Sequence, residues 1–83
     1  MSYIFMSEEI YQPTKQTIPV GKRSSCLAKL AHLCVEEGYY PEHCLQILII
    51  ADDNWEKFKG RKDRLQRLLG IINYALAKNL VAE

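Results

Sequence analysis

The chain has 83 residues, of which 48% are hydrophobic and 25% charged, and its formal net charge is +1 at neutral pH. This length suits one domain whose folding buries about 60% of the surface of the unfolded chain. The composition excludes a largely disordered chain, and the near-neutral charge means that electrostatic binding must depend on where the charges lie. The longest apolar run, 45–51, is far shorter than the roughly 20 residues that span a bilayer, so we expect no membrane partner.

The thiols and imidazoles of the chain do not form a metal-binding pattern. Cys26, Cys34 and Cys44 contain no C-x-x-C pair, and His32 and His43 do not complete the closely spaced pairs of a structural zinc site. The N-terminus carries no basic and then apolar leader, so we expect reduced thiols and a cytoplasmic protein. We expect no metal and no other cofactor. Without a paired acid and base or an activated nucleophile, we also expect no enzyme.

Residues 1–20 differ in pattern from the rest of the chain. An apolar patch at 3–6 is followed by Pro13 and Pro19. Proline lacks the backbone N–H and restricts the residue before it. We therefore predict an extended arm or linker over 1–20, with no helix over 12–20.

From residue 21 to 83 the pattern is helical. Apolar residues from Leu27 to Val35 recur at the spacing of three and four that lines one face of a helix. Gly38 follows, and glycine readily adopts the left-handed conformation that ends a helix. The first helix is predicted over 24–37.

Two further helices follow. Pro41 suits the first turn of a helix, and 41–52 is apolar nearly all round, which is typical of a buried helix. A continuous apolar stripe then predicts the longest helix from about Asp63 to Leu80. The predicted fold is all-α, a small bundle of three helices over 21–83 with four helices as the alternative.

A basic segment separates the last two helices. From Trp55 to Arg67 there are six basic and two acidic side chains, a local net charge of +4. Cations that follow phosphates, with aromatic rings on which bases stack, are typical of proteins that bind single-stranded nucleic acid. In the alternative interpretation the aromatic rings seal the core and the charges form a solvated face. The candidate nucleic-acid-binding residues are Lys22, Arg23, Trp55, Lys57, Phe58, Lys59, Arg61, Lys62, Arg64 and Arg67.

Asp52 and Asp53 precede this segment. Adjacent residues on a helix point about 100° apart, so the two carboxylates do not readily face one metal ion. We expect them to end the second helix and to pair with Lys57, Arg61 or Arg64.

Two stretches resemble known replication proteins. G-K-R at 21–23 followed by L-A-K-L-A at 27–31 resembles the helical domain C-terminal to the polymerase core in primase–polymerases of phages and plasmids. A-D-D-x-W-x-K-F-x-G-R-x-D-R at 51–64 is similar to a segment of phage primase–helicase replication proteins. The resemblance covers roughly 21–76 and implies a helical accessory domain that helps a primase to engage template DNA, single-stranded or primed, or the initiating nucleotide. The polymerase and helicase motifs of such proteins are absent, so the chain would not be an active primase. The resemblance carries over Lys22, Arg23, Lys57, Lys59, Arg61 and Arg64.

The sequence therefore predicts a non-catalytic nucleic-acid-binding module of a DNA replication protein. The alternative is a protein–protein interaction or oligomerisation module that docks on a replication partner or on itself, through residues 3–11 and the exposed edge of the second helix. One geometric property distinguishes the two interpretations. The first requires the cations to form one solvent-facing ridge, and it fails if they are neutralised one by one by Asp52, Asp53, Glu56 and Asp63.

Overall fold

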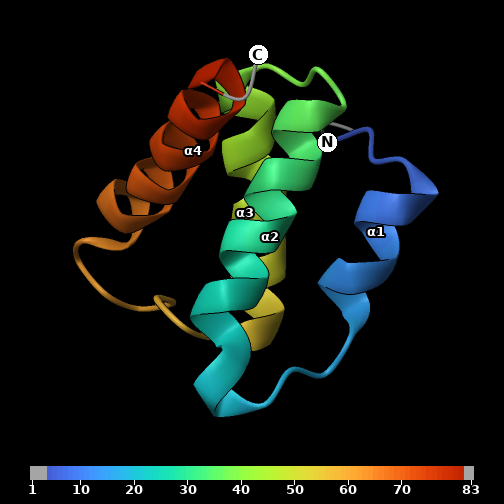
Figure 1. Cartoon of the computed structure of the whole chain (residues 1–83). Coiled ribbons are helices and arrows are strands. Elements are labelled where there is room, and N and C mark those ends of the chain that lie inside the picture. Colours follow the sequence, from blue (N-terminus) through green and yellow to red (C-terminus); the bar gives the residue numbers. More distant parts are fainter. Residues whose placement is uncertain (1–3, 82–83) are drawn as a thin grey trace.

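The computed structural model describes residues 4–81, and this part of the chain is all-helical. Figure 1 shows α2 and α3 at the centre, with α1 and α4 on opposite sides of them. The predicted all-α bundle is confirmed, in its four-helix form. The elements are α1 (Glu8–Lys15), the short 3-10 helix η1 (Val20–Lys22), α2 (Arg23–Glu36), α3 (Pro41–Trp55) and α4 (Arg64–Val81).

Helix α1 corrects the prediction of an extended arm. Pro13 lies inside this helix, where it removes only one backbone hydrogen bond from a short element. Ile10 and Thr14, one turn apart, are both buried against the bundle. Their burial outweighs the cost of the proline, so the segment is part of the bundle and not a linker. Residues 1–3 of the predicted arm lie outside the described residues.

The end of α1 is held by the last turn of α3. The side-chain amide of Asn54 donates to the carbonyl oxygens of Thr14 and Gln16, at 3.0 and 3.1 Å. The indole Nε1 of Trp55 also donates to the Gln16 oxygen, at 2.9 Å. Carbonyl groups at the end of a helix lack partners within it, and these donors from α3 supply them.

The three predicted helices are present with small shifts in their boundaries. Gly38 ends α2 at a φ of +84°, where its N–H bonds the carbonyl oxygen of Val35. Pro41 opens α3, which continues through Trp55, about one turn beyond the predicted end at residue 52. The core extends along this added turn.

Helix α3 is less buried than its composition predicts. Ile47 and Leu48 are fully buried, but Leu45, Ile49 and Ile50 are only half-buried. The centre of the bundle is the pair of helices α2 and α3, each of which packs against both outer helices. The buried apolar residues are Ile10, Leu27, Leu30, Ala31, Cys34, Val35, Cys44, Ile47, Leu48, Ala51, Trp55, Phe58, Leu68, Ile72 and Ala75.

Candidate nucleic-acid interface

The connection between α3 and α4 is organised around the carboxylate of Asp52, which is fully buried. Its Oδ1 accepts the backbone N–H groups of Lys57 and Phe58, at 3.0 and 2.9 Å. Its Oδ2 accepts a hydrogen bond from Nε of Arg64 at 2.9 Å. Glu56 reverses the chain with a φ of +60°, and its N–H bonds the Asp52 carbonyl oxygen. This carboxylate therefore fixes the turn that leads out of α3.

Arg64 joins the start of α4 to the end of α3. Besides its bond to Asp52, its Nη2 donates to Asp53 at 2.7 Å and to the carbonyl oxygen of Ile49 at 3.1 Å. Its hydrogen bond to Asp53, followed by the one to Asp52, raises the pKa of the Arg64 guanidinium. The predicted pairing of Asp52 and Asp53 with Arg64 is confirmed, and this guanidinium has a structural role.

Three more of the candidate cations lie next to carboxylates. Asp63 accepts hydrogen bonds from Nε of Arg61 at 2.9 Å and from Nε of Arg67 at 3.0 Å. Hydrogen bonds from Arg67 and Arg61 hold the pKa of the Asp63 carboxyl below its usual value. Nζ of Lys59 lies 3.9 Å from Glu56. Four of the six cations in 55–67 thus have an acidic partner, the arrangement that counts against a phosphate-binding ridge.

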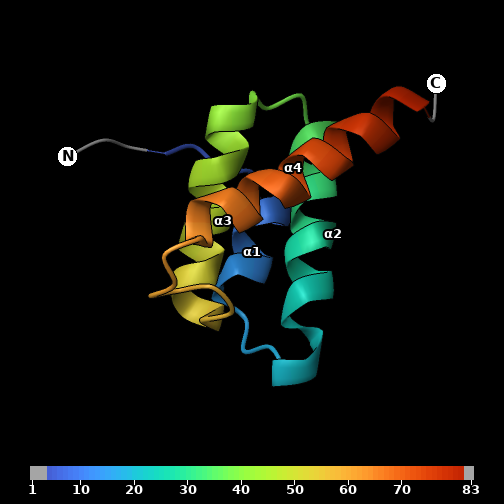
Figure 2. The ribbon, with the colours of Figure 1, turned by 90° about the vertical axis from the view of Figure 1, so that its left-hand side faces the viewer.

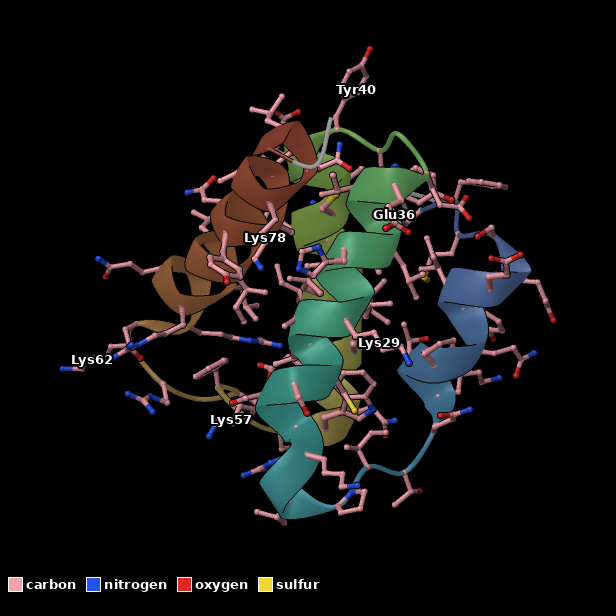
Figure 3. All side chains as sticks on the ribbon, in the orientation of Figure 1. Lys29, Glu36, Tyr40, Lys57, Lys62 and Lys78 are labelled. Atoms are coloured by element: carbon pink, nitrogen blue, oxygen red, sulfur yellow. The ribbon has the colours of Figure 1, made fainter. Side chains whose placement is uncertain are left out.

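Within residues 4–81, Lys57 and Lys62 are the two members of this segment for which no acidic partner is found. Figure 3 shows them apart from one another on the connection between α3 and α4, each pointing away from the bundle. When the two acidic residues before the segment are included, the net charge over 52–67 falls to +2. The expected convergence of cations is therefore not what the geometry shows.

Both aromatic side chains of the segment belong to the core. Trp55 is 6% exposed and Phe58 is 9% exposed. A base stacks on an open ring face, and neither ring offers one. The expectation that Trp55 and Phe58 stack on bases is corrected, and the alternative, in which they seal the core, describes what the structure shows.

The two basic residues before α2 also divide into different roles. Nη1 of Arg23 donates to the carbonyl oxygens of Trp55 and Glu56, at 3.1 and 2.8 Å. These are end carbonyls of α3, and a basic side chain there satisfies groups that the helix leaves without partners. Lys22 is exposed in η1. Arg23 therefore caps α3 from a distant part of the sequence.

Burial disfavours the thiolate form of Cys34 and Cys44. Burial raises the pKa of the Cys34 thiol to about 12, and it also raises the pKa of the neighbouring Cys44 thiol. Over 4–81 we find no group of three or more His, Cys, Asp or Glu side chains that could hold a metal ion.

Helix α4 exposes apolar residues that the sequence pattern assigned to one buried stripe. Leu68 and Ile72 are fully buried, but Leu65, Leu69 and Leu80 are 53%, 40% and 75% exposed. The apolar stripe of α4 is wider than the face that α2 and α3 cover. The sequence shows the width of the apolar stripe, but it does not show which side of the stripe remains exposed to solvent.

A groove runs between α2 and the first half of α4. It has a volume of about 660 Å³. Arg67 and Asp63, which are paired with one another, lie along its polar side. It is lined by Ser24, Ala28, Phe58, Asp63, Gln66, Arg67, Gly70, Ile71 and Tyr74.

Comparison of the chain with known protein families, curated proteins and solved structures gave no match. None of the helices in the described part of the chain has both the length and the apolar character needed to cross a membrane.

Proposed function

We propose that the chain is a non-catalytic protein–protein interaction module that docks through an exposed flank of α4. The observation that carries this proposal is a line of apolar side chains along that helix, which we call the α4 leucine line: Leu65, Leu69, Leu76 and Leu80. Three of them are exposed and Leu76 is half-buried. Single exposed leucines are normal on a protein surface, whereas several that are aligned along one helix are typical of an interaction site.

The charged side chains of α4 lie away from this line. At 100° per residue, Arg64, Arg67 and Lys78 all fall on the opposite flank of the helix. Nζ of Lys78 lies over the ring of Tyr74, and that ring packs against His32 of α2. Figure 3 shows Lys78 on this flank. The α4 leucine line thus has no charged neighbour within its own helix, which lowers the desolvation cost of docking.

The position of α4 leaves this side accessible. Figure 2 shows α4 lying across α3 and α2 on the near face of the bundle, with no other helix of the described chain over it. The surface differs from the one that the sequence pointed to, which was residues 3–11 and an edge of the second helix. From residue 4 onward, the first of these is held against the bundle by buried Ile10, and Phe5 and Tyr11 remain exposed.

Nucleic-acid binding and a place in a replication protein stay predictions. Four cations paired with carboxylates and two buried aromatic rings reduce the support for nucleic-acid binding. A replication partner rests on the resemblance over 21–76 alone. The interaction proposal uses only the shape and chemistry of α4.

Site-specific photo-crosslinking in the cells that make the protein tests the proposal. A photoreactive residue at Leu69 should give a covalent protein–protein product, and one at exposed Glu36, on α2, should not. No product from Leu69, or equal products from both positions, would refute docking through α4. Anisotropy of a labelled single-stranded oligonucleotide tests the rival function, because buried Trp55 is a poor reporter of surface binding. Salt-sensitive binding that weakens in Lys57→Glu would favour the nucleic-acid interpretation.

A further inference from the structure

We infer that the partner of the α4 leucine line is a second copy of this chain, with the two α4 helices antiparallel about a two-fold axis between Ile72 and Asn73. This inference rests on the proposed docking through α4 and names the occupant. It is carried by the spacing of the four leucines, by the chemistry along the line, and by the residue next to the axis.

The leucine spacing is symmetric along the helix. The intervals between successive leucines are four, seven and four residues, so their midpoint lies between residues 72 and 73. With a rise of about 1.5 Å per residue, the inner leucines lie roughly 5 Å and the outer ones roughly 11 Å from that midpoint on both sides. An antiparallel copy therefore places Leu65 opposite Leu80 of the second chain, and Leu69 opposite its Leu76.

The spacing is also symmetric around the helix. Steps of four and seven residues rotate by about +40° and −20°, so all four leucines fall within a sector of about 60°. The bisector of Ile72 and Asn73 lies at the centre of this sector. A two-fold axis perpendicular to α4 at this point satisfies both the axial and the angular symmetry of the line. A different partner protein would not require the four leucines to be symmetric, either along the helix or around it.

The chemistry of the line is complementary to itself. In an isologous interface the same surface of both copies meets, and residue i of one copy contacts residue j of the other, so a charged residue on the line would be buried against a leucine of the second copy. This line carries leucine against leucine, and the three cations of α4 are on the other flank. Asn73 is exposed beside the axis, and its amide has both donors and an acceptor, so it can pair with its own copy.

Sedimentation of the whole chain over a wide concentration range gives the first test. We expect a reversible monomer–dimer equilibrium that changes little with salt, because the interface is apolar. Leu69→Glu should be monomeric throughout. Gln16→Glu adds the same charge on the exposed loop after α1, and it should behave as the unmodified chain. Circular dichroism establishes that both variants keep their helices. A chain that stays monomeric at every concentration would overturn the inference.

A second experiment tests the register. Leu65→Glu and Leu80→Lys should each be monomeric alone, and a mixture of the two variants should form a heterodimer because the new charges face each other across the axis. The substitutions suit the acidic preference of a helix start and the basic preference of a helix end. Leu65→Glu mixed with Leu69→Lys should stay monomeric. No association in the first mixture, or equal association in both, rules out the proposed pairing.

The photo-crosslinking experiment separates this inference from the proposed function. A product of Leu69 that contains two copies of the chain supports both. A product that contains only a different protein overturns self-association and leaves docking through α4 intact. The absence of any product overturns docking through α4, and self-association with it.

Discussion

Replacing Asp52 by asparagine tests how the connection between α3 and α4 is held. The substitution keeps an oxygen that can accept the N–H groups of Lys57 and Phe58, but it places an amide NH₂ against Nε of Arg64. One charge-assisted hydrogen bond is lost at a fully buried position. We therefore expect a loss in the free energy of unfolding without a change of fold.

The structure sets the size of this loss. Removing one partner of a buried ion pair costs about 3–5 kcal/mol when the other charge is left uncompensated. Here Arg64 keeps Asp53 and the Ile49 carbonyl, and its side chain is 21% exposed. We expect a loss of about 2–3 kcal/mol, near the value of one hydrogen bond to a charged group. At about 0.05–0.15 kcal/mol per residue, this is a large part of the total stability of such a chain.

Asp53→Asn is the matched control. Asp53 is the adjacent residue and contacts the same guanidinium at 2.7 Å, but its side chain is 53% exposed. Exposed ion pairs contribute at most about 1 kcal/mol. Burial is therefore the main difference between the two substitutions.

Urea unfolding followed by circular dichroism measures both variants. Asp52→Asn should lower the unfolding midpoint clearly more than Asp53→Asn does, with an unchanged dependence on urea concentration. Equal losses in the two variants would refute the argument that the buried carboxylate organises this turn.

Three further predictions concern single side chains. Gly70→Ala should stabilise the chain by about 0.5–1 kcal/mol, because Gly70 lies inside α4 and a Cβ there meets no atom within 4 Å. A lower midpoint temperature of thermal unfolding in this variant would contradict the prediction. The pKa of the Asp63 carboxyl is lower in the folded chain than in the unfolded chain, so the ionised carboxylate stabilises the fold at pH values above the unfolded-state pKa. This stabilisation is lost as the pH falls through the lower pKa of the folded chain. Asp63→Asn should therefore flatten the acid side of a plot of unfolding free energy against pH. An alkylating reagent should modify half-buried Cys26 before Cys34, whose pKa is about 12; mass spectrometry showing equal rates would contradict this.

The helices that the sequence predicted are those with strong local signals. Periodic leucines, Gly38 after α2 and Pro41 before α3 act within a few residues of the boundaries that they set. Helix α1 was not predicted because the residues that stabilise its end lie far from it in the sequence. The donors of Asn54 and Trp55 reach it across about 40 residues of chain, and no local pattern shows them.

The arrangement of the candidate cations could not be predicted for a related reason. Counting charges from Trp55 onward omits Asp52 and Asp53, which lie in the last turn of α3 and neutralise Arg64. Their pairing with Arg64, and the neutralisation of the cations by neighbouring carboxylates, were both among the expectations. The buried position of the aromatic rings was also an open alternative. Only the packing of α1 and α4 around the end of α3 determines how much of the segment faces solvent.

The bond from the Trp55 indole to the Gln16 carbonyl makes the lone tryptophan an optical reporter of the first helix. Helix α1 contains no tryptophan, yet its detachment would expose this indole to water and shift its emission to longer wavelength. Undocking of the N-terminal segment can in this way be followed in the unlabelled protein.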